Sequence, residues 1–425
     1  MRHLLLALVP VAALAAGWFF FRPLPLDAVS RSAALPDGAA LVARGRYLAD
    51  AADCAACHTA RGGKPYAGGV AFTLPFGTIR STNSTPDPQH GIGGWSDAEF
   101  VRALRQGIGR HGENLYPAFP YASYARMSTD DAIAIHAYLK TLTPVPVDAP
   151  ANSLAFPFDQ RWLVRGWNLL FLPTSPWTPD PRRSAAWNRG AYLVEGPGHC
   201  AECHSPRNLL FGMNRSRHLA GGEVDGWKAW NITSDRRDGI GWWTDAELRR
   251  YLTTGHAPRH GAAAGKMREA IELSLSRLRP DDVDAIVTYL RTVPARSGDT
   301  AARVTPSTPA MQASRAWTPV DGRSDANGRR LFAGACASCH GWTGAGQQSA
   351  RAALAGARAV NDASGSNLIR VILAGIEGPT PARSMPGFAR SHTDAEVAAI
   401  ANYVIGHFGG RTGKVRVDDV SKARK

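Results

Sequence analysis

All six cysteines of the chain lie in one repeated motif. The pattern C-x-x-C-H occurs three times, as Cys54, Cys57 and His58, as Cys200, Cys203 and His204, and as Cys336, Cys339 and His340. Two thiols at this spacing can each add to a haem vinyl group, and the adjacent histidine then lies under the iron as its proximal ligand. The motifs therefore predict three covalently bound haem c groups.

Two other chemistries use paired cysteines. A thioredoxin-like redox pair and half of a zinc site both contain C-x-x-C, but neither requires a histidine directly after the second cysteine at every occurrence. Because no cysteine is left over, a disulfide framework is also disfavoured. Haem attachment accounts for all three copies.

A haem iron that is held by one histidine needs a sixth ligand, and the methionines are few. Met127 follows the first motif, Met385 follows the third, and the second is followed by Met213 and Met267. Met213 is too close to His204 to cross the haem, whereas Met267 has a spacing similar to that of Met127. Core filling is the alternative role for a single methionine. We predict Met127, Met267 and Met385 as sixth ligands, which would raise the reduction potential.

The remaining histidines do not recur at equivalent positions in the three repeats. We interpret them as surface or packing residues; they include His90, His111, His136, His256, His260, His392 and His407.

The length of 425 residues fits about three domains, which agrees with three motifs at regular intervals. We predict a signal peptide or membrane anchor and three haem domains, separated by an aromatic and proline-rich connector and a flexible linker and followed by a charged tail. The boundaries in chain order are 1–30, 31–150, 151–184, 185–295, 296–322, 323–410 and 411–425.

Helices must position the motifs, so the predicted fold is mainly α. Each motif is preceded by a short helical pattern that contains a glycine, Gly45, Gly190 or Gly328, where two backbones can approach closely. Each domain ends in a segment with apolar residues at helical spacing, at 132–139, 283–290 and 397–404.

A second repeat covers residues 83–99 and 231–247, and the third domain lacks it. Ser96 with Glu99 and Thr244 with Glu247 have the spacing of a capping box, which predicts a helix start in both domains. Asn83 and Asn231 match the glycosylation triplet, but their equivalent positions favour hydrogen bonding to the backbone or the haem edge.

The N-terminus has a positive start and an apolar run from Leu4 to Phe21. A cleaved signal peptide and an uncleaved membrane anchor explain this run equally well. Both place the haem domains outside the cytoplasm. The balance of 49 Lys and Arg against 35 Asp and Glu gives a net charge of +14, which six haem propionates would partly offset. This charge suggests nucleic acid, an anionic membrane surface or an acidic protein partner, and it cannot choose among them. Haem motifs in an exported chain argue against nucleic acid.

Several segments resemble the tri-haem cytochrome c subunit of bacterial membrane-bound dehydrogenases. The similarity covers about residues 40–410 and is most specific in the first two domains. It is carried by Ala67–Val70, Phe76–Ile79, Ser81–Asn83, Gly91–Asp97 and Leu115–Tyr121.

The resemblance implies three tandem class I cytochrome c domains that transfer electrons and have no substrate-oxidising site of their own. It implies a catalytic dehydrogenase partner of quinoprotein, flavoprotein or molybdenum type that oxidises an alcohol, an aldehyde or a sugar acid. Ubiquinone or a terminal oxidase would accept the electrons at the periplasmic face of the bacterial inner (cytoplasmic) membrane. It also supports Met127, Met267 and Met385 as ligands. A stand-alone cytochrome, or a haem enzyme with an open iron site, is the alternative.

The chain departs from the family pattern at two places, and it contains two linker segments. Phe119 stands where many relatives carry methionine, and residues 413–425 show no evident amphipathic helix. Residues 291–325 lack periodicity and predict an extended tether before the third domain. Residues 141–187 are too rich in Trp and Phe for a free linker, so we expect packing between the first two domains, or a surface for the catalytic subunit or the membrane.

Overall fold

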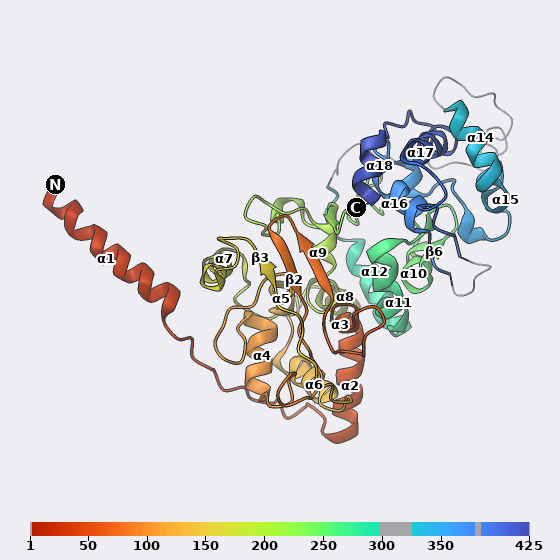
Figure 1. The fold of residues 1–425 in the computed structure, drawn as a ribbon. Coiled ribbons are helices and arrows are strands. Elements are labelled where there is room, and N and C mark those ends of the chain that lie inside the picture. The colour runs from red at the N-terminus through yellow and green to blue at the C-terminus, as the bar shows by residue number, and fades with distance from the viewer. Residues whose placement is uncertain (1, 297–324, 379–383, 425) are drawn as a thin grey trace. The chain divides into compact units, whose positions relative to one another are not determined.

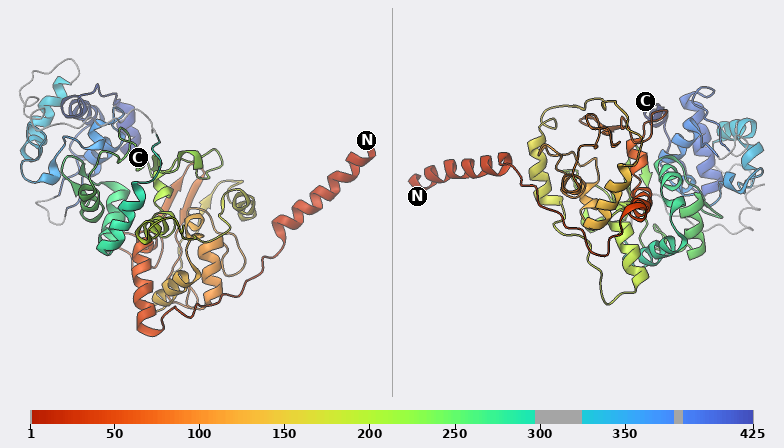
Figure 2. Two further views of the ribbon diagram at one scale, coloured as in Figure 1. Left: turned by 180° about the vertical axis from the view of Figure 1, so that it is seen from behind. Right: turned by 90° about the horizontal axis from the view of Figure 1, so that it is seen from below.

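The computed structural model describes residues 2–296, 325–378 and 384–424, without the side chains of residues 2–9, 11 and 12. Helices dominate both of its compact units (Figures 1 and 2). The first unit comprises residues 1–202 and 207–213, and the second comprises residues 203–206 and 214–425. The division into three haem domains therefore stays a prediction.

The first unit contains the first haem motif and the start of the second. Its elements are α1 (Arg2–Phe21), α2 (Gly38–Ala51), α3 (Cys54–His58), β1 (Ala71–Leu74), β2 (Gly77–Arg80), α4 (Asp97–Gln106), α5 (Tyr121–Tyr124), α6 (Thr129–Leu139), β3 (Ser153–Leu154), the 3-10 turn η1 (Arg161–Leu163), α7 (Val164–Phe171) and α8 (Ala185–Glu195). The second motif forms α9 (Cys200–His204), which the boundary between the units divides.

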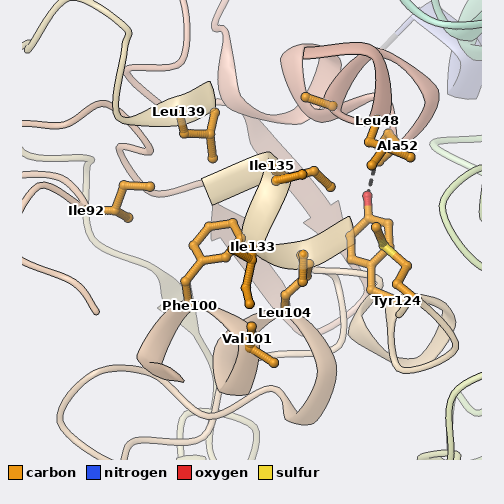
Figure 3. Close-up of a cluster of buried hydrophobic side chains, with 14 of the residues drawn as sticks. Leu48, Ala52, Ile92, Phe100, Val101, Leu104, Tyr124, Ile133, Ile135 and Leu139 are labelled. Carbon is orange, nitrogen blue, oxygen red and sulfur yellow. Dashed lines mark hydrogen bonds between the residues drawn. The ribbon is translucent and has the colours of Figure 1, made fainter. Parts of the chain in front are cut away.

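The core of the first unit forms where α2 crosses α6. A Cβ at Gly45 would lie 1.8 Å from the carbonyl oxygen of Ala134, so only glycine permits this close crossing. Apolar side chains from α2, α4 and α6, among them Leu48, Phe100 and Ile133, fill the space around the crossing (Figure 3). The predicted glycine contact is thus confirmed in this unit.

The segment predicted as an aromatic connector is packed onto the first unit. β3 pairs with β2 and completes an antiparallel sheet in the order β1-β2-β3. The rings of Phe76 and Phe158 are stacked with centroids 4.0 Å apart. Tyr121 donates a hydrogen bond to the Asn168 side chain on α7 at 2.7 Å. These contacts explain why the segment is too apolar for a free linker.

The second unit contains two helical parts. The first has 3-10 turns η2 (Arg215–Arg217) and η3 (Leu275–Arg277), strands β4 (Gly222–Val224), β5 (Trp227–Ala229), β6 (His256–Ala257) and β7 (Gly261–Ala262), and helices α10 (Asp245–Thr254), α11 (Gly265–Leu273) and α12 (Pro280–Leu290). The second has helices α14 (Ala326–Ala335), α15 (Ala337–His340), α16 (Ser366–Ala374), α17 (Asp394–Gly409) and α18 (Val417–Arg424), with 3-10 turns η5 (Ala350–Ala352) and η6 (Arg358–Asn361).

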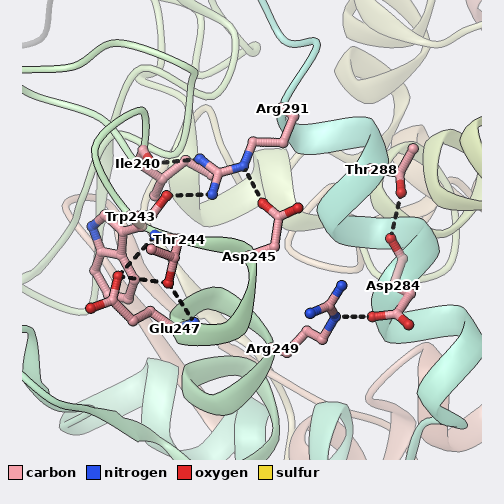
Figure 4. Close-up of polar contacts among 9 residues, drawn as sticks. All are labelled: Ile240, Trp243, Thr244, Asp245, Glu247, Arg249, Asp284, Thr288 and Arg291. Atoms are coloured by element: carbon pink, nitrogen blue, oxygen red, sulfur yellow. Dashed lines mark hydrogen bonds and ion pairs between the residues drawn. The ribbon is translucent and has the colours of Figure 1, made fainter.

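Helices α10 and α12 are joined by polar contacts (Figure 4). The predicted capping box opens α10, because Thr244 Oγ1 accepts from the Glu247 backbone N–H and the Glu247 carboxylate accepts from the Thr244 backbone N–H. Arg291 at the end of α12 donates to Asp245 at 2.8 Å and to the carbonyl oxygen of Ile240 at 2.9 Å. The equivalent box of Ser96 and Glu99 opens α4 in the first unit.

Helices α14 and α17 repeat the crossing seen in the first unit. A Cβ at Gly328 would lie 2.0 Å from the carbonyl oxygen of Ala399. The C-terminal residues add a helix that the sequence analysis missed, because α18 packs on α16 and α17 with Val420 fully buried. The segment before α18 is fixed by Asn402, whose side chain forms two hydrogen bonds with the backbone of Val415, each 3.0 Å long.

The two parts of the second unit are in direct contact. Lys228 forms an ion pair with the buried Asp362 at 2.8 Å, and the Asn367 side chain bonds both backbone groups of Lys228 at 2.9 Å. Buried polar contacts therefore join these two parts in addition to the chain that connects them. The flexible linker at residues 296–322 stays a prediction. Most of the predicted linker, residues 297–324, lies outside the described residues.

The N-terminal apolar run forms α1, whose last turn packs on η1. Phe20 contacts the Trp162 ring with centroids 5.2 Å apart, and Arg165 donates to the carbonyl oxygen of Arg22 at 2.8 Å. Among the residues with described side chains, no helix combines the length and apolarity needed to cross a membrane. The predicted signal or anchor falls partly outside these side chains, which begin at Pro10.

Candidate haem sites

Each C-x-x-C-H motif forms a single helical turn or slightly more. The motif helices are α3, α9 and α15, and the last begins directly after Cys336. A helical turn places the second cysteine and the histidine close to the first cysteine, which is the arrangement that two thioether bonds to one porphyrin require. All six cysteines are half-buried, so the thiols are accessible enough for this role.

The three motif histidines share one hydrogen-bond pattern. Nδ1 of His58 lies 2.8 Å from the carbonyl oxygen of Thr82, Nδ1 of His204 lies 2.6 Å from that of Trp230, and Nδ1 of His340 lies 2.6 Å from that of Ala352. Nδ1 of His58 has a second neighbour, the Ser84 hydroxyl oxygen at 2.7 Å, which can also accept. A carbonyl oxygen only accepts, so a proton on Nδ1 satisfies all three carbonyl bonds. The tautomer leaves the Nε2 lone pair of each ring available for iron, as in other metal-bound histidines.

Burial supports the same protonation state. Desolvation lowers the pKa of His58, His204 and His340, although the bond to the carbonyl oxygen opposes this effect. A lowered pKa keeps the imidazole neutral, and only a neutral ring can bind iron. The donor set and its hydrogen bonds therefore fit haem at all three motifs.

Met127 lies in the core of the first unit with no exposed surface. Cys54 packs against the same apolar cluster, so the cluster joins the predicted sixth ligand to the first motif. Tyr124 donates to the carbonyl oxygen of Ala52 at 2.8 Å and ties the segment before Met127 to the end of α2. Burial in an apolar cluster suits a thioether ligand, but core filling would give the same burial.

The other two predicted methionine ligands are half-buried. Met267 lies in the first turn of α11, where a Cβ at Gly265 would meet the Trp227 ring at 2.4 Å. The backbone of Met385 forms a bridge with Ile376 through bonds of 2.9 and 2.8 Å. Met213, which was not chosen as a ligand, forms a bridge with Arg207. Iron ligation by these methionines stays a prediction.

Three of the remaining histidines are buried packing residues. His136 lies 2.8 Å from Asp97, and the His260 ring is stacked on Trp243 with centroids 3.5 Å apart. Nε2 of His256 lies 2.9 Å from the carbonyl oxygen of Ala350. These contacts agree with the interpretation that the three histidines are packing residues.

Asn83 and Asn231 support the histidines through the backbone. Both side chains are buried, and the Oδ1 atom of each accepts from the backbone N–H two positions later. Nδ2 of Asn83 donates to the carbonyl oxygen of Val145 at 2.8 Å, and Nδ2 of Asn231 donates to that of Arg296 at 2.6 Å. The predicted backbone role is confirmed. The sequence analysis missed the carbonyl partners of the histidines, although Thr82 and Trp230 directly precede the repeated asparagines.

Contacts also join consecutive sites. Ser123 on α5 donates its hydroxyl hydrogen to Glu202 of the second motif at 2.6 Å. Tyr192 on α8, close before that motif, donates to Asp131 on α6. The chain between the first motif and Met127 therefore touches the start of the second motif.

Three C-x-x-C-H helices, each with a histidine held by a backbone carbonyl oxygen, are typical of a multihaem c-type cytochrome. Residues 42–143 match the family model for cytochrome c, and residues 323–404 match the model for subunit III of cbb3-type cytochrome c oxidase.

Similar proteins of known function show which kind of c-type cytochrome the chain resembles. The chain is 40% identical over 403 residues to the fructose dehydrogenase cytochrome subunit of Gluconobacter japonicus, which covers 90% of this chain and 82% of the relative. It is 37% identical over 407 residues to the gluconate 2-dehydrogenase cytochrome c subunit of Pantoea cypripedii, covering 91% of this chain and 90% of the relative. It is 46% identical over 375 residues to a nicotinate dehydrogenase component of Pseudomonas putida, covering 86% of this chain but 30% of that longer relative. The chain belongs to the family of cytochrome c subunits of membrane-bound dehydrogenases.

Proposed function

We propose that the chain accepts electrons from a catalytic dehydrogenase subunit and passes them across three haems to ubiquinone or a terminal oxidase. The complex would lie at the periplasmic face of the bacterial cytoplasmic membrane. The names of the relatives support a dehydrogenase partner, and the substrate would be set by that partner, of quinoprotein, flavoprotein or molybdenum type.

The observation that carries the proposal is the repeated histidine geometry. Three half-buried imidazoles each donate Nδ1–H to a backbone carbonyl oxygen. Such a bond fixes the ring orientation and raises the basicity of Nε2. Haem, when bound, supplies a one-electron redox couple at each site.

The protein residues hold the sites and connect them. Met127, Met267 and Met385 would fill the sixth positions, raise the potentials and deny small molecules access to the irons. The bond of Ser123 to Glu202 holds the second motif against the segment that leads to Met127. The bond of His256 to Ala350 joins the two parts of the second unit beside the third motif.

Rapid mixing of the purified complex of this chain and its catalytic subunit tests the proposal. Substrate should reduce all three haems, and a short-chain ubiquinone should then re-oxidise them. The proposal fails if the haems stay oxidised while the catalytic subunit still reduces an artificial acceptor. A haem enzyme with an open iron would instead bind carbon monoxide in the unmodified protein and turn over without the partner.

A further inference from the structure

An exposed apolar surface lies on the first unit around α7 and the loop that follows the second motif. Of the 15 large apolar side chains that are exposed among the described residues, eight lie here: Phe156, Phe158, Leu163, Leu169, Leu170, Leu209, Leu210 and Phe211. We call this set the α7 patch. Single exposed apolar residues are ordinary, but a grouped set marks a binding surface.

Ring contacts and hydrogen bonds show that the patch is continuous. Phe158 and Phe211 both pack on Phe76, with centroids 4.0 and 5.2 Å from it. On the other side, Trp167 of α7 donates its indole hydrogen to the carbonyl oxygen of Leu210 at 3.0 Å. The two exposed loops and the helix therefore form one surface.

The loop that carries Leu209 and Leu210 is fixed in an exposed position by hydrogen bonds. Leu209 is 99% exposed, although the loop around it is ordered by Asn208. Oδ1 of Asn208 accepts from the backbone N–H groups of Leu210 at 2.9 Å and Gly212 at 3.0 Å. A loop that is pinned in this way cannot fold its leucines inward, so their exposure is built into the fold.

The patch joins the base of the apolar helix α1. Phe20 and Phe21 contact Trp162, which directly precedes Leu163 of the patch. Exposed Trp18 lies at this end of α1, with the guanidinium of Arg22 4.2 Å from its ring centroid. Tryptophan and arginine at the end of an apolar helix are typical of the boundary between lipid and water.

The charges near the patch favour an anionic surface. Arg22 and Arg161 are exposed beside the segments that form it, together with one exposed acidic residue, Asp159. Arg165 is buried and Arg207 is paired with Glu202, so these two arginines do not contribute to the attraction. Arginines beside apolar side chains attract anionic lipid headgroups while the apolar groups enter the acyl boundary.

We propose that the α7 patch binds the surface of an anionic lipid bilayer and holds the first unit against the membrane. The inference rests on the proposed membrane location and names the surface responsible for it. Leu169, Leu170, Leu209 and Leu210 enter the boundary region, and the exposed Arg22 and Arg161 contact the headgroups.

An introduced thiol tests this arrangement. In the holoprotein the native cysteines are bound to haem, so Leu209→Cys provides the one free thiol. The full holoprotein is placed in nanodiscs of phosphatidylethanolamine and phosphatidylglycerol without the catalytic subunit and treated with a hydrophilic maleimide. Leu209→Cys should react at least about tenfold more slowly than Val417→Cys, because lipid covers it. Val417 is 48% exposed and lies on α18, outside the patch.

Two further variants show whether the leucines cause the protection. Leu169→Glu with Leu170→Glu, combined with Leu209→Cys, should restore rapid labelling, whereas the same pair changed to methionine should keep the thiol protected. Unchanged haem absorption verifies the fold of each variant.

Equal labelling rates at positions 209 and 417 would overturn the proposal. Protection that arises only after the catalytic subunit is added would also overturn it, in favour of a protein interface. Neither result would affect substrate-driven haem reduction, so a failed inference is distinguishable from a failed function.

Discussion

Nε2 of His256 lies 2.9 Å from the carbonyl oxygen of Ala350, two residues before the carbonyl group that accepts from His340. Arg351 between them donates to the Thr254 carbonyl oxygen at 2.6 Å. The short turn η5, which orients the proximal histidine of the third site, is therefore held by the part of the unit that precedes residue 296.

We expect His256→Phe to alter the third haem. The phenyl ring keeps the volume but cannot bond Ala350, so η5 loses one support and the bond that fixes the His340 ring weakens. Redox titration should show a shifted midpoint potential for one haem and unchanged potentials for the other two. His111→Phe, at an exposed position, serves as the control. A shift of all three potentials would contradict a local effect.

Glycine at the helix crossings can be tested by adding one methyl group. Gly328→Ala would place Cβ 2.0 Å from the carbonyl oxygen of Ala399, a backbone atom that cannot give way. We expect a loss of roughly 1–3 kcal/mol in the free energy of unfolding, measured by denaturant titration. Gly334→Ala on the same helix meets nothing within 4 Å and should leave the stability unchanged or slightly raised. Gly45→Ala should behave like Gly328→Ala.

Methionine ligation predicts a selective change in ligand binding. Met127→Ala removes the thioether and should open one haem of the three to carbon monoxide, with loss of part of the near-infrared band of His–Met iron. Met267→Ala and Met385→Ala should do the same at their own sites. Met213→Ala should leave all three haems closed. Carbon monoxide binding to the unmodified reduced protein would show that a site lacks its methionine.

The stability of the second unit should depend on pH through His260. Burial lowers the pKa of His260 from its ordinary value of 6.5 to about 4, although Glu247 at 3.3 Å opposes this, while Arg259 and His256 add to it. Between pH 6.5 and 4 the unfolded chain binds a proton at this position and the folded chain does not. The contribution of neutral His260 to the free energy of unfolding is therefore fully present above pH 6.5, and it is lost as the pH falls toward 4.

The magnitude of this effect is up to about 1.4 kcal/mol per pH unit. His260→Phe should reduce the slope of the unfolding free energy against pH by up to one proton in this range. His111→Phe should leave the slope unchanged, because that side chain is exposed. A slope that is unaffected by loss of His260 would contradict its neutral, buried state.

Local and periodic features of this fold were predictable from the sequence. The capping boxes at Ser96 and Thr244, the helix crossing at Gly45 and the backbone role of Asn83 follow from residue types at fixed spacings. Such features depend on a few neighbouring residues, or on a pattern that the chain repeats.

Contacts between segments that are distant in the chain, and that no repeated motif marks, could not be predicted from the sequence. Ala352 accepts from His340 although no asparagine follows it, and any residue can supply a backbone carbonyl group. The ion pair of Lys228 with Asp362 joins distant segments, and neither residue type is unusual at its position. Helix α18 has too few apolar residues to be recognised before the site that buries Val420 is known.

The crossing of α2 and α6 determines the order of maturation. The first haem motif lies in the chain between Gly45 and Ala134, the two residues that meet in this crossing. If the chain is exported from its N-terminus, as the sequence predicts, the motif would leave the translocation channel before α6 does. Its thiols would then still be on an open chain, because the crossing cannot form until α6 arrives.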